Sequence, residues 1–354
     1  KTLASTRAFH SFLDKTAMVC TSSGPAQPPA DPFGTAKRDS ADSNLLTVRQ
    51  TFSDRACADR IVTAVAFQPG SSEFVAVAYG PLPGHTHGTG EGIIHVWSTR
   101  APELPAFTVE CEGDVTALAF AAKDSQLIFG GTQQGRVMLW DLRVGADPVA
   151  QSFPVAEGHQ APIFAVIASA PSGTGAAAAG GADVLTVSGE GRVCQWHQGL
   201  SMPAHSSLLS SADHGMPTAA SSPEEDRRSV FMGTADGALL AVTIAADQLD
   251  AKTLEGGHQA AITSVDCHPP TANRNLSGLV LTASLDWGCR LWWAPALGSW
   301  RSLEVRGADA MYDARWCPAN PAVFACGDGS GRVYVYNAGH SVDAPAHSVQ
   351  VSKS

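Results

Sequence analysis

The chain has 354 residues, of which 44% are hydrophobic and 16% are charged, and its formal net charge at pH 7 is −10. The apolar share excludes a chain that is disordered throughout, because it supplies enough apolar surface for a buried core. The acidic balance and the lack of a basic stripe argue against nucleic-acid binding and against binding to an anionic membrane. The longest apolar stretch, residues 163–170, is far shorter than the ~20 residues of a membrane-spanning helix.

The first 44 residues differ from the rest of the chain. Residues 1–20 are predicted to form an amphipathic helix, because their apolar side chains recur at helical spacing. Residues 21–44 are rich in Pro, Ser, Gly and Asp, and they are predicted to be a flexible linker. Residues 45–52 are predicted to be a strand that leads into the remainder. The chain begins with Lys1 and not with Met, so we expect a fragment or a trimmed sequence.

From residue 45 to residue 354 the sequence repeats. Each repeat has a strand of small and β-branched residues, a polar turn that usually contains Gly, and a short strand that ends on a large apolar anchor. The anchors lie roughly 43 to 56 residues apart, which suits four short strands with their loops. They are Trp97, Trp140, Trp196, Val242, Trp292 and Tyr336.

An additional strand is expected upstream of the turn in most repeats. The predicted ranges are 62–67, 115–120, 163–167, 262–267 and 311–316. Two segments rich in Ala, Gly, Ser and Pro, residues 169–183 and 200–228, are predicted to be exposed loops. Four strands per repeat make one propeller blade, so the predicted fold is an all-β, WD40-type β-propeller over residues 45–354. Six blades are visible, and we expect a seventh to be cut off after Ser354.

Two repeats contain the residue types of the hydrogen-bonded tetrad that is typical of WD-repeat blades. In this tetrad a His links an acid in the turn to the strand, and the network stabilises the blade only if every member is satisfied. We expect these residues to be structural and not catalytic. They are His159, Ser188, Glu190 and Trp196 in the third repeat, and His258, Ser284, Asp286 and Trp292 in the fifth.

The sequence offers no set of residues typical of catalysis or of cofactor binding. The glycines of residues 327–331 lack the Lys-Ser/Thr that completes a phosphate loop, and they are interpreted as a blade turn. The eight cysteines include no C-x-x-C pair, and they are interpreted as reduced, buried thiols without a disulfide or zinc role. We therefore expect no enzyme activity, no cofactor and no metal.

Exposed aromatic residues are the best candidates for a partner site. Trp287 occupies a tight turn where the other repeats mostly have Gly. Tyr312 and Asp313 precede the turn of the next repeat and are expected on the same rim as Trp287. These three residues are predicted to be part of a protein-binding rim.

Several segments resemble the dynein intermediate chain family. Residues 284–292 read SLDWGCRLW, residues 308–318 read ADAMYDARWCP, and residues 320–332 read NPAVFACGDGSGR. The resemblance extends to IFGGTQQGRVMLWDLR at 128–143, EGGHQAAIT at 255–263 and FHSFLDK at 9–15. It covers nearly the whole chain in order, which generic WD repeats would not do. The helix before the propeller favours the cytoplasmic type over the axonemal type.

The resemblance implies a non-catalytic propeller that binds the heavy-chain tail of a minus-end-directed microtubule motor. It also implies light-chain partners, bound through a region N-terminal to Lys1, and a cytoplasmic, cytoskeletal location, with a cilium or flagellum as the alternative. Two other functions stay open. One is a different WD-repeat adaptor, such as a ubiquitin-ligase substrate receptor or a ciliary transport or axonemal dynein subunit. The other is a propeller enzyme, which would need acids or His residues that converge on the central channel.

Overall fold

A computed structural model describes residues 50–71, 73–82, 91–122, 124–168, 184–210, 214–223, 228–244, 248–269, 278–293, 301–306, 308–338 and 344–351. The predicted helix at 1–20 and the predicted linker at 21–44 lie outside these residues. Within the described residues the structure is β-sheet, apart from short turns and a 3-10 helix at Arg55–Cys57. No helix in this part of the chain has the length and apolar character needed to cross a membrane.

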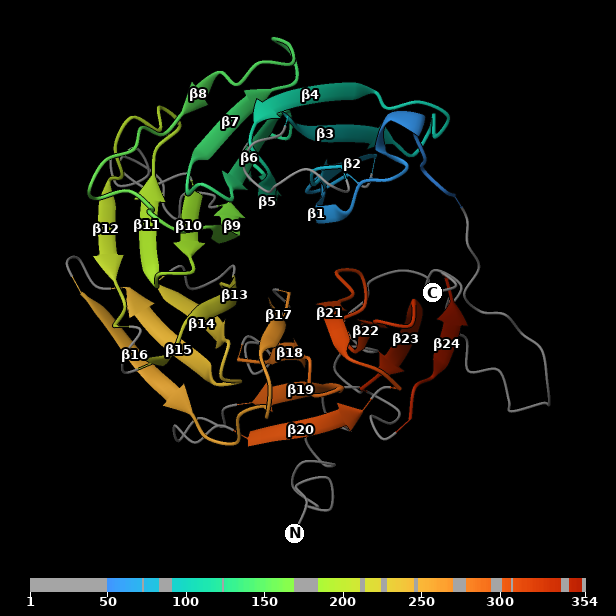
Figure 1. Cartoon of the computed structure of the whole chain (residues 1–354). Helices are drawn as coiled ribbons and strands as arrows, with labels where there is room; N and C mark the ends of the chain where they lie inside the picture. Colours follow the sequence, from blue (N-terminus) through green and yellow to red (C-terminus); the bar gives the residue numbers. More distant parts are fainter. Residues whose placement is uncertain are drawn as a thin grey trace, which may run out of the picture. The chain divides into compact units, whose positions relative to one another are not determined.

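The strands form six sheets of four, and in every sheet each strand lies beside the next one along the chain (Figure 1). These sheets are the blades of the predicted propeller class, so the expected fold class is confirmed, with six blades. Blade 1 consists of β1 Val62–Phe67, β2 Phe74–Tyr79, β3 Glu91–Ser98 and β4 Phe107–Glu112. Blade 2 consists of β5 Val115–Phe120, β6 Leu127–Thr132, β7 Val137–Asp141 and β8 Ala150–Gln151. Blade 3 consists of β9 Ile163–Ala168, β10 Val184–Ser188, β11 Arg192–Trp196 and β12 His205–Leu208.

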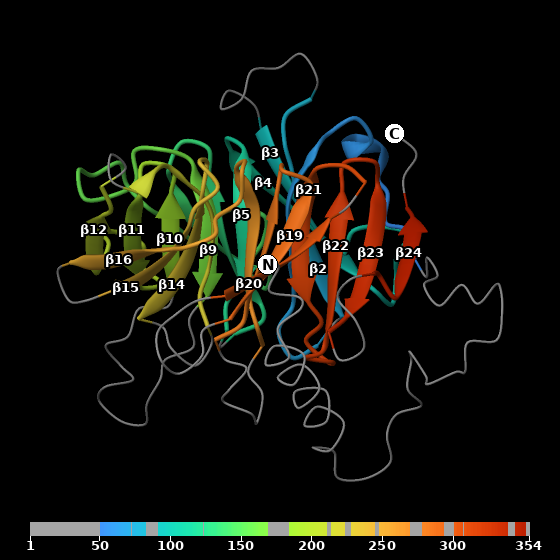
Figure 2. The ribbon, with the colours of Figure 1, turned by 90° about the horizontal axis from the view of Figure 1, so that it is seen from below.

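Blades 4 to 6 follow the same order along the chain. Blade 4 consists of β13 Pro217–Ser221, β14 Ser229–Thr234, β15 Leu239–Ile244 and β16 Leu249–Leu254. Blade 5 consists of β17 Ile262–Cys267, β18 Val280–Ser284, β19 Gly288–Trp293 and β20 Arg301–Arg306. Blade 6 consists of β21 Met311–Trp316, β22 Val323–Asp328, β23 Arg332–Asn337 and β24 His347–Gln350. In blades 5 and 6 all neighbouring strands are antiparallel, as the alternating arrows of β21 to β24 show in Figure 2.

The described chain divides into two compact units. One comprises residues 50–220 and 242–251, and the other comprises residues 221–241 and 252–354. Blades 1 to 3 belong to the first unit, blades 5 and 6 belong to the second, and the strands of blade 4 are divided between them. Each unit has its own apolar core, built from small and β-branched residues of the strands.

The repeat anchors are buried in their blades. Trp97, Trp140, Trp196, Trp292 and Tyr336 are among the largest fully buried side chains, and Val242 is buried as well. Burying a large aromatic side chain removes an extensive apolar surface from water and contributes strongly to folding. The spacing of the anchors along the sequence therefore reflects one buried aromatic or aliphatic anchor in each blade.

A recurrent threonine joins neighbouring blades within each unit. It is the second residue of the first strand, at the point where the register shifts by one residue in a β-bulge. Its hydroxyl donates to the backbone carbonyl that begins the first strand of the next blade. Thr63 donates to Val115 at 2.6 Å, Thr116 donates to Ile163 at 2.6 Å, and Thr263 donates to Met311 at 2.8 Å.

One prediction about the connecting segments was wrong, and a second is not met at the three residues where the structure describes it. The region 200–228 contains β12 and β13 and is not only loop. These strands read HSSL and PTAAS, and neither has the strong apolar alternation by which a half-buried strand is recognised. The predicted strand at 45–52 is not a strand in its described part, because residues 50–52 take no part in a sheet. The insertion at 169–183 lies outside the described residues.

Candidate partner-binding rim and its supporting networks

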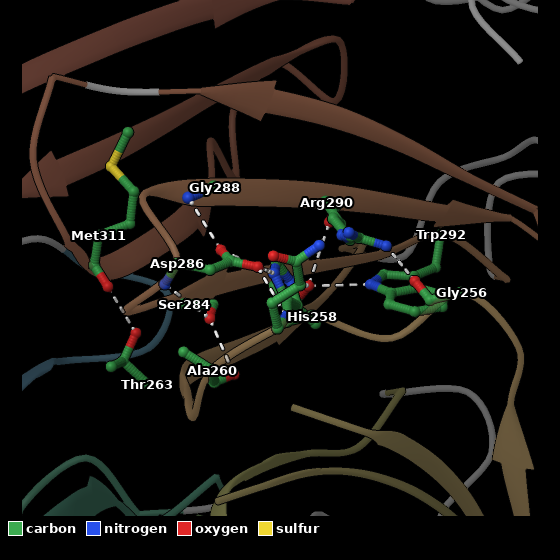
Figure 3. A network of polar contacts seen from close by, with 12 residues as sticks. Gly256, His258, Ala260, Thr263, Ser284, Asp286, Gly288, Arg290, Trp292 and Met311 are labelled. Carbon is green, nitrogen blue, oxygen red and sulfur yellow. Dashed lines mark hydrogen bonds and ion pairs between the residues drawn. The ribbon is translucent and has the colours of Figure 1, made fainter. Parts of the chain in front are cut away.

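Blade 5 contains a continuous chain of buried hydrogen bonds behind its turn (Figure 3). The indole N–H of Trp292 donates to the Thr282 hydroxyl at 2.8 Å. The same hydroxyl lies 2.8 Å from Nε2 of His258, and Nδ1 of His258 lies 3.0 Å from Asp286. One proton arrangement satisfies every member: Thr282 donates to Nε2, and the Nδ1–H group donates to the carboxylate. The network ties the strand, the preceding loop and the turn into one unit.

Asp286 holds the turn of blade 5 in place. Its carboxylate also accepts hydrogen bonds from the backbone N–H groups of Gln259 and Gly288, both at 3.0 Å. Burial raises the pKa of Asp286, but the Gln259 N–H and the neighbouring His258 lower it by more, so that its pKa lies below the usual value. An ionised carboxylate that accepts several N–H bonds is the form that such a site favours. Asp286 therefore acts as the central acceptor of this turn.

The residue assigned to the tetrad hydroxyl needs correction in both blades. In blade 5 the hydroxyl between His and Trp belongs to Thr282 and not to Ser284. Ser284 lies at the end of β18, where it donates to the carbonyl of Ala260 and accepts from the N–H of Asp286. In blade 3 the shared hydroxyl likewise belongs to Thr186 and not to Ser188. Thr282 and Ser284 are two residues apart and therefore face the same side of the strand. The sequence pattern alone is thus compatible with either hydroxyl as the partner of His258 and Trp292.

In blade 3 the acid does not reach the histidine. Nε2 of His159 lies 2.6 Å from Thr186, and Trp196 donates to the same hydroxyl at 2.8 Å. Nδ1 of His159 is buried and has no hydrogen-bond partner among the described residues. Burial, and then the nearby positive charge of Arg192, lower the pKa of His159 to about 3. The predicted link from His159 to Glu190 was therefore wrong.

Glu190 forms other contacts at this turn. Its Oε1 accepts from the N–H of Gln160 at 2.9 Å and from the hydroxyl of Ser188 at 3.3 Å. The guanidinium of Arg192 lies 3.4 Å from the same oxygen. The pairing with Arg192 and the longer side chain give the physical reason for the correction, because Oε1 of Glu190 contacts Arg192, Gln160 and Ser188 and does not reach Nδ1 of His159.

The three residues of the predicted rim lie at one end of blades 5 and 6. Trp287 is in the turn between β18 and β19, and its side chain is 53% exposed. Tyr312 is the bulged second residue of β21 and is 59% exposed. Figure 3 shows Met311, the residue before Tyr312, beside Thr263, whose hydroxyl donates to it. Ile262, the neighbour of Thr263, pairs with Ser284 at the end of β18. The start of β21 and the turn after β18 therefore belong to the same rim.

Asp313 is a partly exposed acid that already has two partners. The hydroxyl of Ser264 donates to it at 2.6 Å, and Nε of Arg315 donates at 3.1 Å. Arg315 also lies 3.6 Å from Asp266, whose pKa is raised to about 6 by burial against the opposing effect of Arg315. Asp313 thus joins blade 5 to blade 6 as well as facing solvent, a role that its position in the sequence does not reveal.

Leu285 is a rim residue that sequence reasoning missed. It lies two positions before Trp287, and its side chain is 40% exposed although it is apolar. Its N–H donates to the carbonyl of Ala261, which fixes the end of β18 against the loop before β17. The signal that could have found it is an apolar residue in a turn position, since the corresponding residues of blades 3 and 6 are Gly189 and Gly329.

The described residues do not contain a recognisable catalytic or metal-binding arrangement. Within them, no three His, Cys, Asp or Glu side chains form a group that could hold a metal ion. A buried Cys–His contact does occur in blade 1, where Sγ of Cys57 lies 3.2 Å from Nε2 of His95. Burial raises the pKa of Cys57 and lowers the pKa of His95, which disfavours a thiolate–imidazolium pair. The cysteines described are free thiols, and most of them are buried.

Comparisons with known proteins agree with the fold and with the sequence motifs. The family model "WD domain, G-beta repeat" matches residues 251–292. The chain is 26% identical over 317 residues to the cytoplasmic dynein 1 intermediate chain of Drosophila melanogaster, a match that covers 88% of this chain and 46% of that protein. The chain thus spans about half the length of that relative. The chain therefore has a WD-repeat match in residues 251–292, and it is similar to a dynein intermediate chain over 88% of its length.

Proposed function

We propose that this chain is a non-catalytic scaffold subunit of a dynein motor complex, and that its blades bind the dynein heavy-chain tail. One observation carries the proposal: the similarity to a cytoplasmic dynein 1 intermediate chain extends over 88% of the chain. The relative's name supports a cytoplasmic location, and an association with microtubules is part of the proposal. Minus-end-directed cargo transport is the corresponding role of the assembly. Dynein light chains are proposed as further partners, bound outside these residues.

The rim of blades 5 and 6 is the proposed contact surface for the heavy chain. Exposed Trp and Tyr side chains are enriched among the residues that dominate binding energy. Trp287 and Tyr312 are more than half exposed and are carried by strands whose turns are fixed by buried hydrogen bonds. Asp313 adds a partly exposed carboxylate next to Tyr312. A rigid support of this kind limits the entropy that a docking surface loses on binding.

Affinity purification from native lysate tests the proposal. The complete gene product is tagged and captured, and the bound proteins are identified by mass spectrometry. Recovery of a dynein heavy chain in stoichiometric amounts is expected, and the heavy-chain isoform separates cytoplasmic from ciliary use. Recovery of a different assembly, such as a ubiquitin ligase, without any dynein subunit would contradict the proposal and favour the general adaptor reading.

A further inference from the structure

The turn at Trp287 has a backbone conformation that favours glycine. In four other described blades the corresponding turn residue is a glycine with φ between +77° and +87°: Gly135, Gly191, Gly237 and Gly331. Trp287 adopts the same left-handed conformation, with φ of +70°. A side chain with a Cβ is strained in this region, and a bulky one is an outlier there. Blade 5 therefore keeps a tryptophan at a position where glycine would relieve backbone strain.

More than half of the Trp287 side chain faces solvent, although its backbone is strained. The indole of Trp287 is 53% exposed, whereas the anchor Trp292 in the next strand is fully buried. No stacking or edge contact between Trp287 and another ring occurs among the described residues. A strained residue whose side chain faces solvent is a reason to look for function, because stability alone would favour its replacement.

Two further apolar side chains lie at the same end of the sheets. Leu285 at the end of β18 is 40% exposed, and Tyr312 at the start of β21 is 59% exposed. Their strands pack against each other, since β21 lies against both β17 and β18. We call Leu285, Trp287 and Tyr312 the rim patch. Apolar and aromatic side chains that cluster on an exposed surface mark interaction sites.

The surroundings of the rim patch are acidic. Asp309 lies next to Tyr312: a methyl group added at Gly329 would meet Tyr312 at 3.0 Å and Asp309 at 3.1 Å. Asp313 follows Tyr312 in the chain, and its side chain is 57% exposed. Arg315, further along β21, is already paired with Asp313 and Asp266. Arg332, at the start of β23 beside the same turn, donates to Gln350. Tyr312 thus has two carboxylates beside it, on a chain whose net charge is −10.

We propose that the rim patch binds a basic amphipathic helix of a partner, with Trp287 as the main anchor. An apolar side chain of the helix packs against Leu285, Trp287 and Tyr312, and flanking Lys or Arg side chains pair with Asp309 and Asp313. Long cationic side chains can also lie over the exposed indole face. The strain at Trp287 is retained for this contact. The inference rests on the proposed function only for the identity of the partner, which would be the heavy-chain tail.

Two substitutions at one position separate strain from binding. Trp287→Gly removes both the strain and the indole, so we expect a higher urea midpoint and weaker binding. Trp287→Ala removes the indole but keeps a Cβ in the left-handed region, so we expect weaker binding without that gain in midpoint. Leu104→Ala removes another exposed apolar side chain, 73% exposed and located between β3 and β4, and serves as the control. A midpoint that does not rise in Trp287→Gly would overturn the inference of retained strain.

Binding is measured by isothermal titration calorimetry with two synthetic amphipathic helical peptides that share one leucine face. One peptide has Lys and the other has Glu on the flanking positions. We expect the Lys peptide to bind the wild-type chain at least about tenfold more tightly than the Glu peptide does. We also expect each Trp287 variant to bind the Lys peptide at least about tenfold more weakly than the wild type does. Added salt should reduce the preference, because it screens exposed charges. Equal affinities for both peptides, or unchanged affinity of the Trp287 variants, would refute a basic helical ligand anchored on Trp287.

Titration with the purified heavy-chain tail separates this inference from the proposed function. If the tail binds the wild-type chain and both Trp287 variants equally, the rim inference fails and the proposed function survives. If the Lys peptide behaves as expected but the tail does not bind at all, the proposed function fails and the basic-helix site stands. Loss of tail binding in both Trp287 variants, with Leu104→Ala unaffected, supports both.

Discussion

Blade 3 and blade 5 start from nearly the same sequence and reach different hydrogen-bond networks. Both have Gly-His-Gln before the first strand, a threonine in the second strand and a tryptophan anchor in the third. They differ in the turn acid, which is Glu190 in blade 3 and Asp286 in blade 5. In both, one carboxylate oxygen accepts the N–H of the glutamine, at 2.9 Å and 3.0 Å. Only the aspartate also reaches the histidine ring.

This difference accompanies two changes at the turn acid: one additional methylene group in Glu190, and the pairing of Glu190 with Arg192. His258 has partners on both ring nitrogens, whereas Nδ1 of His159 is buried without one. A buried polar group without a hydrogen bond costs free energy, and a partly satisfied network is weaker than its members suggest. Blade 5 also bears Leu285 and Trp287 of the rim patch, so the more completely bonded turn is the one that contains the exposed tryptophan with a left-handed backbone. We infer that the stability of this turn is what allows Trp287 to be retained.

Removing the two acids should give the largest contrast. Asp286→Ala leaves the buried Nδ1 of His258 and two backbone N–H groups without their acceptor, so we expect a loss of about 3 kcal/mol in the free energy of unfolding. Glu190→Ala loses contacts that are partly exposed, so we expect less than about 1 kcal/mol. Urea unfolding followed by circular dichroism measures both. Equal losses in the two variants would show that the acids contribute alike, against the observed geometry.

The two histidines should also respond differently to acid. The pKa of His159 is lowered to about 3 in the folded chain, against 6.5 for a free histidine. Below pH 6.5 the unfolded chain therefore binds a proton that the folded chain does not. The stability associated with neutral His159 is fully present above pH 6.5 and is lost as the pH falls toward 3. Between pH 6.5 and pH 5 this loss should amount to about 2 kcal/mol.

The variant His159→Gln tests this dependence. Glutamine retains a hydrogen-bonding group near Thr186 but does not titrate, so the stability of the variant should fall less steeply with acid than that of the wild type. The stability gap that favours the wild type at pH 7 should narrow as the pH is lowered. The readout is the urea midpoint at several pH values for both proteins. Parallel pH curves would rule out a strongly depressed pKa at His159.

Residues with strong apolar patterns could be placed from the sequence alone. Four of the five predicted upstream strands, at 62–67, 115–120, 262–267 and 311–316, agree with the structure at both ends, and the fifth, at 163–167, extends one residue further. The anchors are buried as expected. Each of these features depends on local burial, which leaves a direct trace in the pattern of apolar residues.

The remaining features depend on contacts between segments that are distant in the chain. β12 and β13 are built from small and polar residues, and their pairing with neighbouring strands is what makes them strands. The choice between Thr282 and Ser284 depends on where His258 and Trp292 lie in space. The exposure of Leu285 and the second role of Asp313 follow in the same way from the packing of blade 5 against blade 6. Tertiary context of this kind is absent from local propensity.

Converting the blade 3 acid into that of blade 5 gives the sharpest test of the comparison, although the expected effect is the smallest. Glu190→Asp shortens the side chain by one methylene within a turn of equal length, so the carboxylate can accept from Gln160 and from Nδ1 of His159 together. We expect a gain of about 1 kcal/mol in the free energy of unfolding. The pKa of His159 should rise as well, because a nearby carboxylate favours the charged ring. Histidine titration by NMR and urea unfolding measure the two effects.

The reverse change, Asp286→Glu, should lower the free energy of unfolding through the turn of blade 5. A pKa of His159 that does not move in Glu190→Asp would mean that Arg192, and not side-chain length, keeps the acid away, and Arg192→Ala would then be expected to bring the two together.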